Sequence, residues 1–167
     1  MYKKPPFSEI VRKIDISIGN LLKNDNFLFT IDVHERTISH KLAEYLQMQF
    51  PDWNVDCEYN RDKHEAKKLI DIHSDCNREK DNVYPDIIIH QRNVLNNLLV
   101  IEIKSNEKES ICDVKKLQRF TIDQNFNYSF GLFIQFEKAD PPHKKWFCKG
   151  KIKTEQELLQ NELPPHN

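Results

Sequence analysis

Two apolar, β-branched runs that carry charged side chains constrain the fold of this chain more than any other feature. Residues 83–90 and 98–104 have the length and composition of buried strands, and the polar, Asn-rich residues 91–97 separate them. Two strands joined by a short polar segment form a hairpin. The sequence therefore predicts a β-hairpin that carries charged side chains in strands of a hydrophobic core.

The register of this hairpin brings acidic side chains together. Residues two apart on a strand share a face, so Glu102 lies on the same face as Lys104. Pairing Asp86 with Glu102 puts these three side chains on one surface, with opposed Cβ atoms about 5 Å apart. The same register predicts two further opposed pairs, Ile88 with Val100 and His90 with Leu98.

Carboxylates this close together need a positive charge between them. Burying two of them on an apolar surface costs several kcal/mol unless they are neutralised. A cation such as Mg²⁺ takes oxygen ligands and binds through one or two carboxylates plus a substrate phosphate. The alternative is a surface salt bridge between Glu102 and Lys104. The preceding Pro85-Asp86, the hairpin spacing and the apolar surroundings favour the cation site.

Pro85-Asp86 followed by Glu102-Ile103-Lys104 resembles the PD-(D/E)xK motif of the restriction-endonuclease-like nuclease superfamily, which includes many small bacterial proteins. The resemblance covers roughly residues 32–136. It implies an α/β fold with a restriction-endonuclease-like core, in which helices flank a mixed central β-sheet. It also implies a metal-dependent nuclease that hydrolyses phosphodiester bonds in DNA and uses Mg²⁺ or Mn²⁺, in some relatives as a homodimer. Separately, the scattered cysteines and the lack of a secretion signal predict a cytoplasmic protein.

The resemblance assigns roles to the motif residues. Asp86 and Glu102 would hold the metal ion together with the backbone carbonyl of Ile103. Lys104 would orient the attacking water or compensate charge on the phosphate. The catalytic set expected on this basis is Asp86, Glu102, Lys104 and Glu35.

Glu35 enters this set from a helix predicted over residues 32–50. Asp32 and Glu35 have the spacing of a capping box. At about 100° per residue, Glu35 also belongs to the apolar stripe of this helix, with Leu42 about 20° to one side of it and Leu46 about 20° to the other. That stripe contains Ile38, Leu42 and Leu46. Glu35 therefore either closes the cap or reaches the hairpin as a further ligand, and the resemblance implies the second role.

The rest of the chain predicts one domain over residues 1–167. With 38% hydrophobic residues, a chain of 167 residues can bury a single core. Around residues 32–136 we expect an N-terminal helix over 8–23 and a basic C-terminal extension over 138–167. Further predicted elements are an extended connector at 27–31, a strand at 53–61, an insertion at 62–82, a helix at 110–124, a parallel strand at 128–136 and a short helix at 154–162.

The net charge of −1 means that nucleic acid would have to bind at a local patch. Basic residues after a strand, on the helix that follows the motif, and around a C-terminal tryptophan are the candidates. They are Arg61, Lys116, Arg119, Lys144, Lys145 and Trp146. Equally, the helical cations can form a solvated face, and the C-terminal lysines can protect an edge strand.

Several classes of protein are disfavoured. We find neither a signal peptide nor a run of about 18 apolar residues, so we expect no membrane span. The four scattered cysteines are typical of reduced thiols. Scarce glycine and the lack of a nucleophile elbow argue against kinases and serine hydrolases. A nuclease-fold module that binds nucleic acid or a protein partner without cutting remains the alternative.

Overall fold

The computed structural model describes residues 3–31, 33–58, 84–105, 110–136 and 141–162, together with the backbone of residues 61–62 and 65–66. The predicted insertion at 62–82 falls largely outside these residues. The described elements are α1 (Phe7–Asn24), η1 (Asn26–Phe29), α2 (Glu35–Gln49), β1 (Asn54–Cys57), β2 (Arg61–Asp62), β3 (Glu65–Ala66), β4 (Ile87–Gln91), β5 (Asn96–Ser105), α4 (Ile111–Ile122), β6 (Phe130–Phe136), β7 (His143–Cys148), β8 (Lys151–Lys153) and α5 (Glu155–Gln160).

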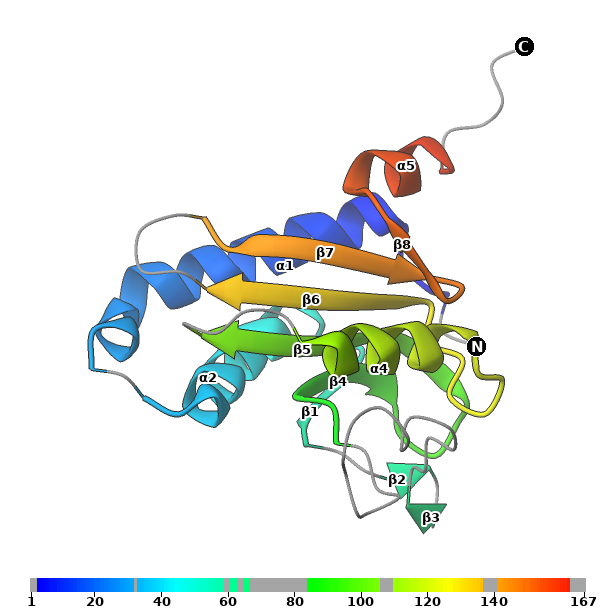
Figure 1. The fold of residues 1–167 in the computed structure, drawn as a ribbon, viewed down its shortest axis with the longest axis horizontal. Helices are drawn as coiled ribbons and strands as arrows, with labels where there is room; N and C mark the ends of the chain where they lie inside the picture. The colour runs from blue at the N-terminus through cyan, green and yellow to red at the C-terminus, as the bar shows by residue number, and fades with distance from the viewer. Residues whose placement is uncertain are drawn as a thin grey trace.

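A six-stranded mixed sheet in the order β1-β4-β5-β6-β7-β8 forms the middle of the molecule (Figure 1). Strands β5 and β6 are parallel, and the other neighbours in this sheet are antiparallel. Helices α1 and α2 pack on one face and α4 packs on the other. The prediction of an α/β fold with helices flanking a mixed sheet is confirmed, as is the parallel strand after the crossover helix.

The alternation of β5 divides the core into two clusters. Leu99, Ile101 and Ile103 are buried against α1 and α2. Val100 is buried on the opposite face, where Leu117 from α4 covers it. Because side chains two apart share a face, Glu102 also points to the α4 side. The strand thus carries a carboxylate into a layer that is otherwise hydrophobic.

The hairpin register is confirmed at its acidic end. Ile88 lies opposite Val100 and Ile87 lies opposite Ile101, so the next position brings Asp86 level with Glu102. The prediction for the other end is wrong, because the register shifts after Ile89 and His90 lies opposite Asn97. Leu98 is the extra residue in β5, and its side chain is buried in the same cluster as Leu99.

Two predicted N-terminal features differ from the structure. Residues 27–31 are not extended, because η1 forms a 3₁₀ turn there. Helix α2 begins at Glu35 after His34, whose side chain makes no capping hydrogen bond. Asp32, the predicted cap, lies outside the described residues. The capping alternative for Glu35 therefore involves a residue outside those described, and Glu35 itself is the first residue of α2.

Strands β7 and β8, which lie within the predicted C-terminal extension, belong to the central sheet. Strand β7 pairs with β6 along its length. Trp146 is only 2% exposed, and its ring lies 4.8 Å from that of Phe7 in the hydrophobic core. The prediction that Trp146 stacks on nucleic-acid bases is therefore wrong, because its ring is already packed.

The structure also bears on the predicted lack of a membrane span and on the predicted state of the cysteines. Among the described helices, none has the length and apolar composition needed to cross a membrane. Cys57 and Cys148 are free thiols, as expected. Cys112 is disulfide-bonded, so the expectation of reduced thiols is wrong for this residue.

Two glycine substitutions test the packing. A Cβ added at Gly19 meets nothing within 4 Å, so Gly19→Ala should stabilise α1 by about 0.5–1 kcal/mol. A Cβ added at Gly131 would lie 3.2 Å from Phe147 Cβ and 3.3 Å from a Leu117 methyl, so Gly131→Ala should destabilise by about 1 kcal/mol or more. Urea unfolding measures both, and equal effects of the two variants would contradict this packing.

Candidate active site

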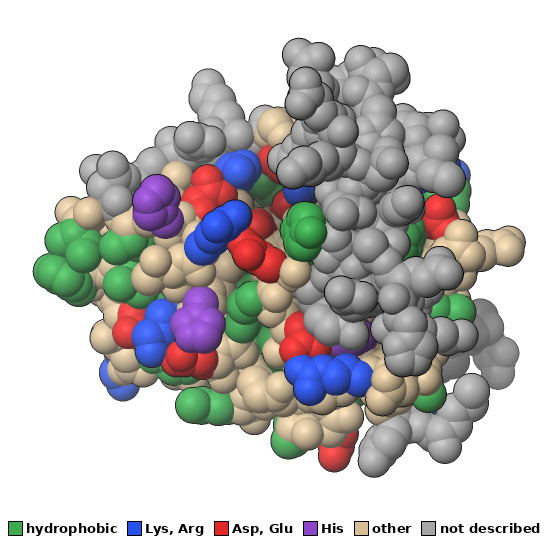
Figure 2. Space-filling view, turned by 90° about the horizontal axis from the view of Figure 1, so that it is seen from below, with side chains coloured by type: hydrophobic (Ala, Val, Ile, Leu, Met, Phe, Trp, Pro, Cys, Tyr) green, Lys and Arg blue, Asp and Glu red, His purple; other side chains and the backbone are tan. Residues whose placement is uncertain are grey.

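Nine charged or aromatic residues line a pocket of about 380 Å³ where β4 begins and β5 ends. We call it the acidic pocket, and its lining residues are Glu35, Arg36, Glu58, Tyr84, Asp86, Glu102, Lys104, Asp113 and Lys116. Charged side chains of both signs gather on the face that is seen from below (Figure 2). If all are ionised, five carboxylates and three cationic groups give the pocket a formal charge of −2. Glu35, Asp86, Glu102 and Lys104, predicted to form one site, all line it.

Asp86 precedes β4 and is anchored to the neighbouring strand. Its Oδ2 accepts a hydrogen bond of 2.7 Å from the backbone N–H of Ile103. A strand residue directs its N–H and C=O to the same neighbour, so the Ile103 carbonyl faces this side as well. Burial raises the pKa of Asp86, and the Ile103 hydrogen bond opposes that rise only in part. The site thus favours a charge-neutralising partner for this carboxylate.

Glu102 is the most buried acid of the pocket. Its side chain is 5% exposed, and Oε2 accepts a 2.5 Å hydrogen bond from Lys116 Nζ. Its Oε1 is buried and has no hydrogen-bond partner among the described residues. Burial raises the pKa of Glu102 to about 8, because the charge of Lys116 offsets the loss of hydration only in part. A residue that lines the pocket therefore has a buried carboxylate oxygen without a hydrogen-bond partner among the described residues.

Lys104 reaches from the end of β5 to the start of α2. Its Nζ lies 3.0 Å from Glu35 Oε2. Burial acts to lower the pKa of Lys104, but the hydrogen bond and charge of Glu35 outweigh it and the pKa is raised. Glu35 thus reaches the hairpin residues, as expected from its place on the helix, and it does so as the partner of Lys104.

At the rim, Arg36 pairs with Glu58 at 2.6 Å. Glu58 follows β1 and has a φ of 49°, which turns the chain at the end of that strand. Both side chains are largely exposed. This pair can therefore move to admit a ligand at little energetic cost.

Lys116 and Asp113 belong to the site, although neither was predicted to line it. Lys116 was expected on a basic, solvent-facing side of the helix, yet its side chain is only 6% exposed. It is buried because it bridges Glu102 and Asp113, with 3.5 Å to the latter. The sequence signal that could have indicated this contact is the Ser110–Asp113 capping box, because it places Asp113 one helical turn before Lys116.

Among the candidates for nucleic-acid binding whose side chains are described, Arg119, Lys144, Lys145 and Trp146 do not line the acidic pocket. Lys144 lies on β7, and its Nζ pairs with Asp15 at 2.6 Å and with Glu155 at 3.3 Å. Lys145 neighbours it on the same strand. Arg119 is half-buried on α4. The side chain of Arg61 is not among those described.

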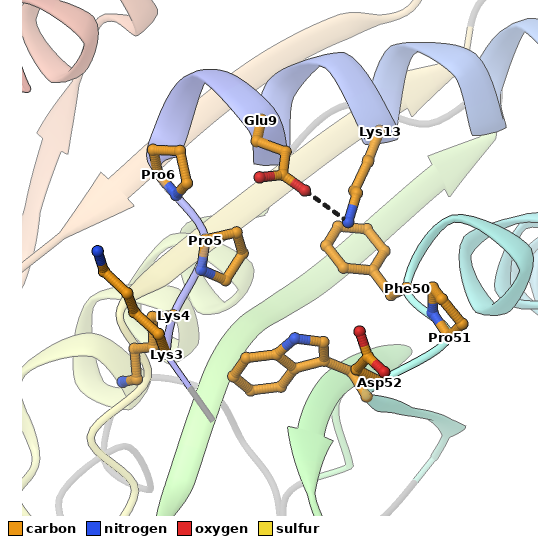
Figure 3. A pocket seen from close by; sticks show the side chains of 10 residues that line it. Lys3, Lys4, Pro5, Pro6, Glu9, Lys13, Phe50, Pro51 and Asp52 are labelled. Carbon is orange, nitrogen blue, oxygen red and sulfur yellow. Dashed lines mark ion pairs between the residues drawn. The ribbon is translucent and has the colours of Figure 1, made fainter. Parts of the chain in front are cut away.

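A second pocket, of about 300 Å³, lies between the N-terminal segment and the residues before β1 (Figure 3). Lys13 pairs there with Glu9 at 2.8 Å, and its Nζ lies 4.9 Å from the centre of the Phe50 ring. This pocket is at the opposite end of β1 and β4 from Asp86. None of the predicted catalytic residues lines it.

The acidic pocket has a donor set that suits a hard cation. In the part of the chain that the structure describes, no three His, Cys, Asp or Glu side chains are arranged as ligands of one metal ion. Mg²⁺, however, requires only one or two carboxylates, with water and substrate completing its shell. Asp86 and the unpartnered Oε1 of Glu102 supply those, and the Ile103 carbonyl adds a neutral oxygen. The residues present therefore fit such an ion.

No protein-family model, curated protein or solved structure matches this chain.

The buried acid predicts a pH dependence of stability in the absence of divalent cations. Between pH 4.5, the ordinary pKa of Glu102, and its folded pKa of about 8, the folded state binds a proton that the unfolded state has lost. This contribution of Glu102 to the free energy of unfolding therefore falls as pH rises. Glu102→Gln should become progressively more stable than the wild type from pH 5 to about pH 8, as measured by urea unfolding with EDTA.

Glu9→Gln is the matched control, because its carboxylate is 38% exposed on α1. Its stability relative to the wild type should stay constant over the same range. A constant difference for Glu102→Gln as well would show that Glu102 is not the buried acid described.

Proposed function

We propose that this protein is a metal-dependent nuclease of the PD-(D/E)xK type, with DNA as its substrate, built on a restriction-endonuclease-like core. One observation carries the proposal. A buried carboxylate oxygen, Glu102 Oε1, has no hydrogen-bond partner in the described part of the chain, and Glu102 lines a pocket together with Asp86 and Lys104. An oxygen of this kind is costly unless a cation completes its environment.

Asp86, Glu102 and the Ile103 carbonyl would hold Mg²⁺ or Mn²⁺, with Glu35 as a direct or water-mediated ligand. When bound, the ion would supply Lewis acidity toward the scissile phosphate and lower the pKa of a bound water. When all its groups are ionised, the pocket has a formal charge of −2, which favours a divalent cation. Without a cation, the same charge repels a phosphodiester, so metal would have to precede or accompany the substrate.

Lys104 supplies the positive charge next to the reacting phosphate. Its ammonium lies at the end of β5, where Glu35 fixes its position at 3.0 Å. A held ammonium stabilises charge that develops on the phosphate without reorganising at the moment of reaction. It can equally orient the attacking water. Besides its role as a ligand, Glu35 would position Lys104 through their direct ion pair.

Incubation of the purified protein with single-stranded, duplex and branched DNA in Mg²⁺ or Mn²⁺ tests the proposal. We expect cleavage that EDTA abolishes. Asp86→Asn, Glu102→Gln and Lys104→Met should each lower the rate at least a hundredfold, about 3 kcal/mol of transition-state stabilisation.

Glu9→Gln and Lys153→Met serve as controls, since they change exposed ion pairs on α1 and β8. Both should cleave at the wild-type rate. Cleavage that persists in EDTA, or full activity of Asp86→Asn and Lys104→Met, would refute the assignment.

A non-cleaving nuclease-fold module is the second candidate, and one observation favours it. Lysine side chains already pair with two of the pocket's acids, Glu35 and Glu102, so part of the site is neutralised from within. Such a module would retain DNA or a protein partner without any product. A gel-shift assay in the same Mg²⁺ buffer separates the two, because retention without cleavage supports the module and cleavage supports the enzyme.

A further inference from the structure

Lys116 and Asp113 have no role in the proposed reaction, yet they are among the most buried charged residues of the acidic pocket. Their side chains are each 6% exposed. Burying an ammonium and carboxylates is costly unless each is paired with good geometry. Lys116 satisfies this condition by contacting Glu102 at 2.5 Å and Asp113 at 3.5 Å.

The two oxygens of Glu102 differ in their surroundings. Oε2 is bonded to Lys116, whereas Oε1 is buried with no hydrogen-bond partner among the described residues. A lysine that merely replaced a metal ion would occupy the oxygen that the ion uses. Lys116 instead bonds one oxygen, and the other has no hydrogen-bond partner among the described residues, so the lysine does not compete with a cation for the same oxygen of Glu102.

The two oxygens of Asp113 each have a different partner. Its Oδ2 accepts a hydrogen bond of 2.8 Å from the Ser110 hydroxyl, and its Oδ1 faces Lys116. Ser110 and Asp113 form the capping box that starts α4. A continuous series of contacts therefore joins the start of α4 to the acidic residue of β5, through Ser110, Asp113, Lys116 and Glu102.

We infer that Lys116, held by Asp113, is a positioning residue that fixes Glu102 with Oε1 directed into the acidic pocket to receive a divalent cation. This inference rests on the proposed function, since it concerns the same metal site. It assigns Lys116 to the metal centre rather than to contact with nucleic acid. It also makes the capping box of α4 part of the architecture of the site.

Mn²⁺ affinity, measured by titration calorimetry and by the electron paramagnetic resonance signal of free Mn²⁺, tests the inference without requiring cleavage. Lys116→Met keeps the apolar stem and removes the ammonium, so Glu102 loses its anchor. We expect Mn²⁺ affinity at least tenfold weaker than in the wild type. Lys116→Arg restores the charge and should recover part of the affinity. Lys115→Met, the same substitution one residue earlier on α4, should bind within about twofold of the wild type.

Asp113→Asn provides a second variant, because Lys116→Met leaves a buried carboxylate without its partner and can fail to fold. The amide can still accept the Ser110 hydrogen bond, while the charge that holds Lys116 is lost. We expect Mn²⁺ affinity about threefold weaker with an unchanged circular dichroism spectrum. Wild-type affinity in Asp113→Asn and in any folded Lys116→Met would overturn the inference.

The outcomes separate this inference from the proposed nuclease activity. Mn²⁺ binding that depends on Lys116, in a protein that cleaves no DNA, supports the positioning role and removes the nuclease proposal. Cleavage by the wild type with unchanged affinity and rate in Lys116→Met supports the nuclease and removes the positioning role. A wild type that binds no Mn²⁺ at millimolar concentration contradicts both.

Discussion

The burial of Glu102 is the constraint on which the rest of the site depends. A carboxylate placed in a hydrophobic layer must be paired, and a second carboxylate beside it raises that demand. Lys116 donates a hydrogen bond to Glu102 Oε2, and no group among the described residues bonds to Oε1. The packing of α4 on the sheet is thereby tied to the chemistry of the pocket, because the helix that covers Val100 also brings the ammonium to Glu102.

The alternation of side chains along the strands places the other charged groups of the acidic pocket. Ile101 and Ile103 bury one face of β5, and the residues between and beyond them, Glu102 and Lys104, are left for the pocket. The antiparallel neighbour contributes Asp86 just before its first strand residue, where a backbone N–H of β5 would otherwise lack a partner. The site therefore forms at the end of a hydrophobic sheet, where Glu102 is the buried charged residue of β5.

The residues that the sequence predicts correctly are those governed by local period. The alternation of the strands placed Ile88 opposite Val100, and the helical period placed Glu35 toward the hairpin. The alternation of apolar and polar residues does not reveal a β-bulge, so the predicted partner of His90, Leu98, is one residue away from its actual partner, Asn97. Lys116 was expected on an exposed basic face, either in contact with nucleic acid or solvated. Helical patterning does not reveal that Glu102, from a distant strand, pairs with this lysine in a buried position.

The central claim is that the described carboxylates accept a divalent cation beside an intact Lys116–Glu102 pair. Anomalous diffraction from a crystal grown with Mn²⁺ tests it most directly. The account predicts a peak at about 2.0–2.3 Å from oxygens of both Asp86 and Glu102, with Lys116 still bonded to the second Glu102 oxygen. A pocket without a peak at saturating Mn²⁺, or a peak that excludes either carboxylate, would contradict it.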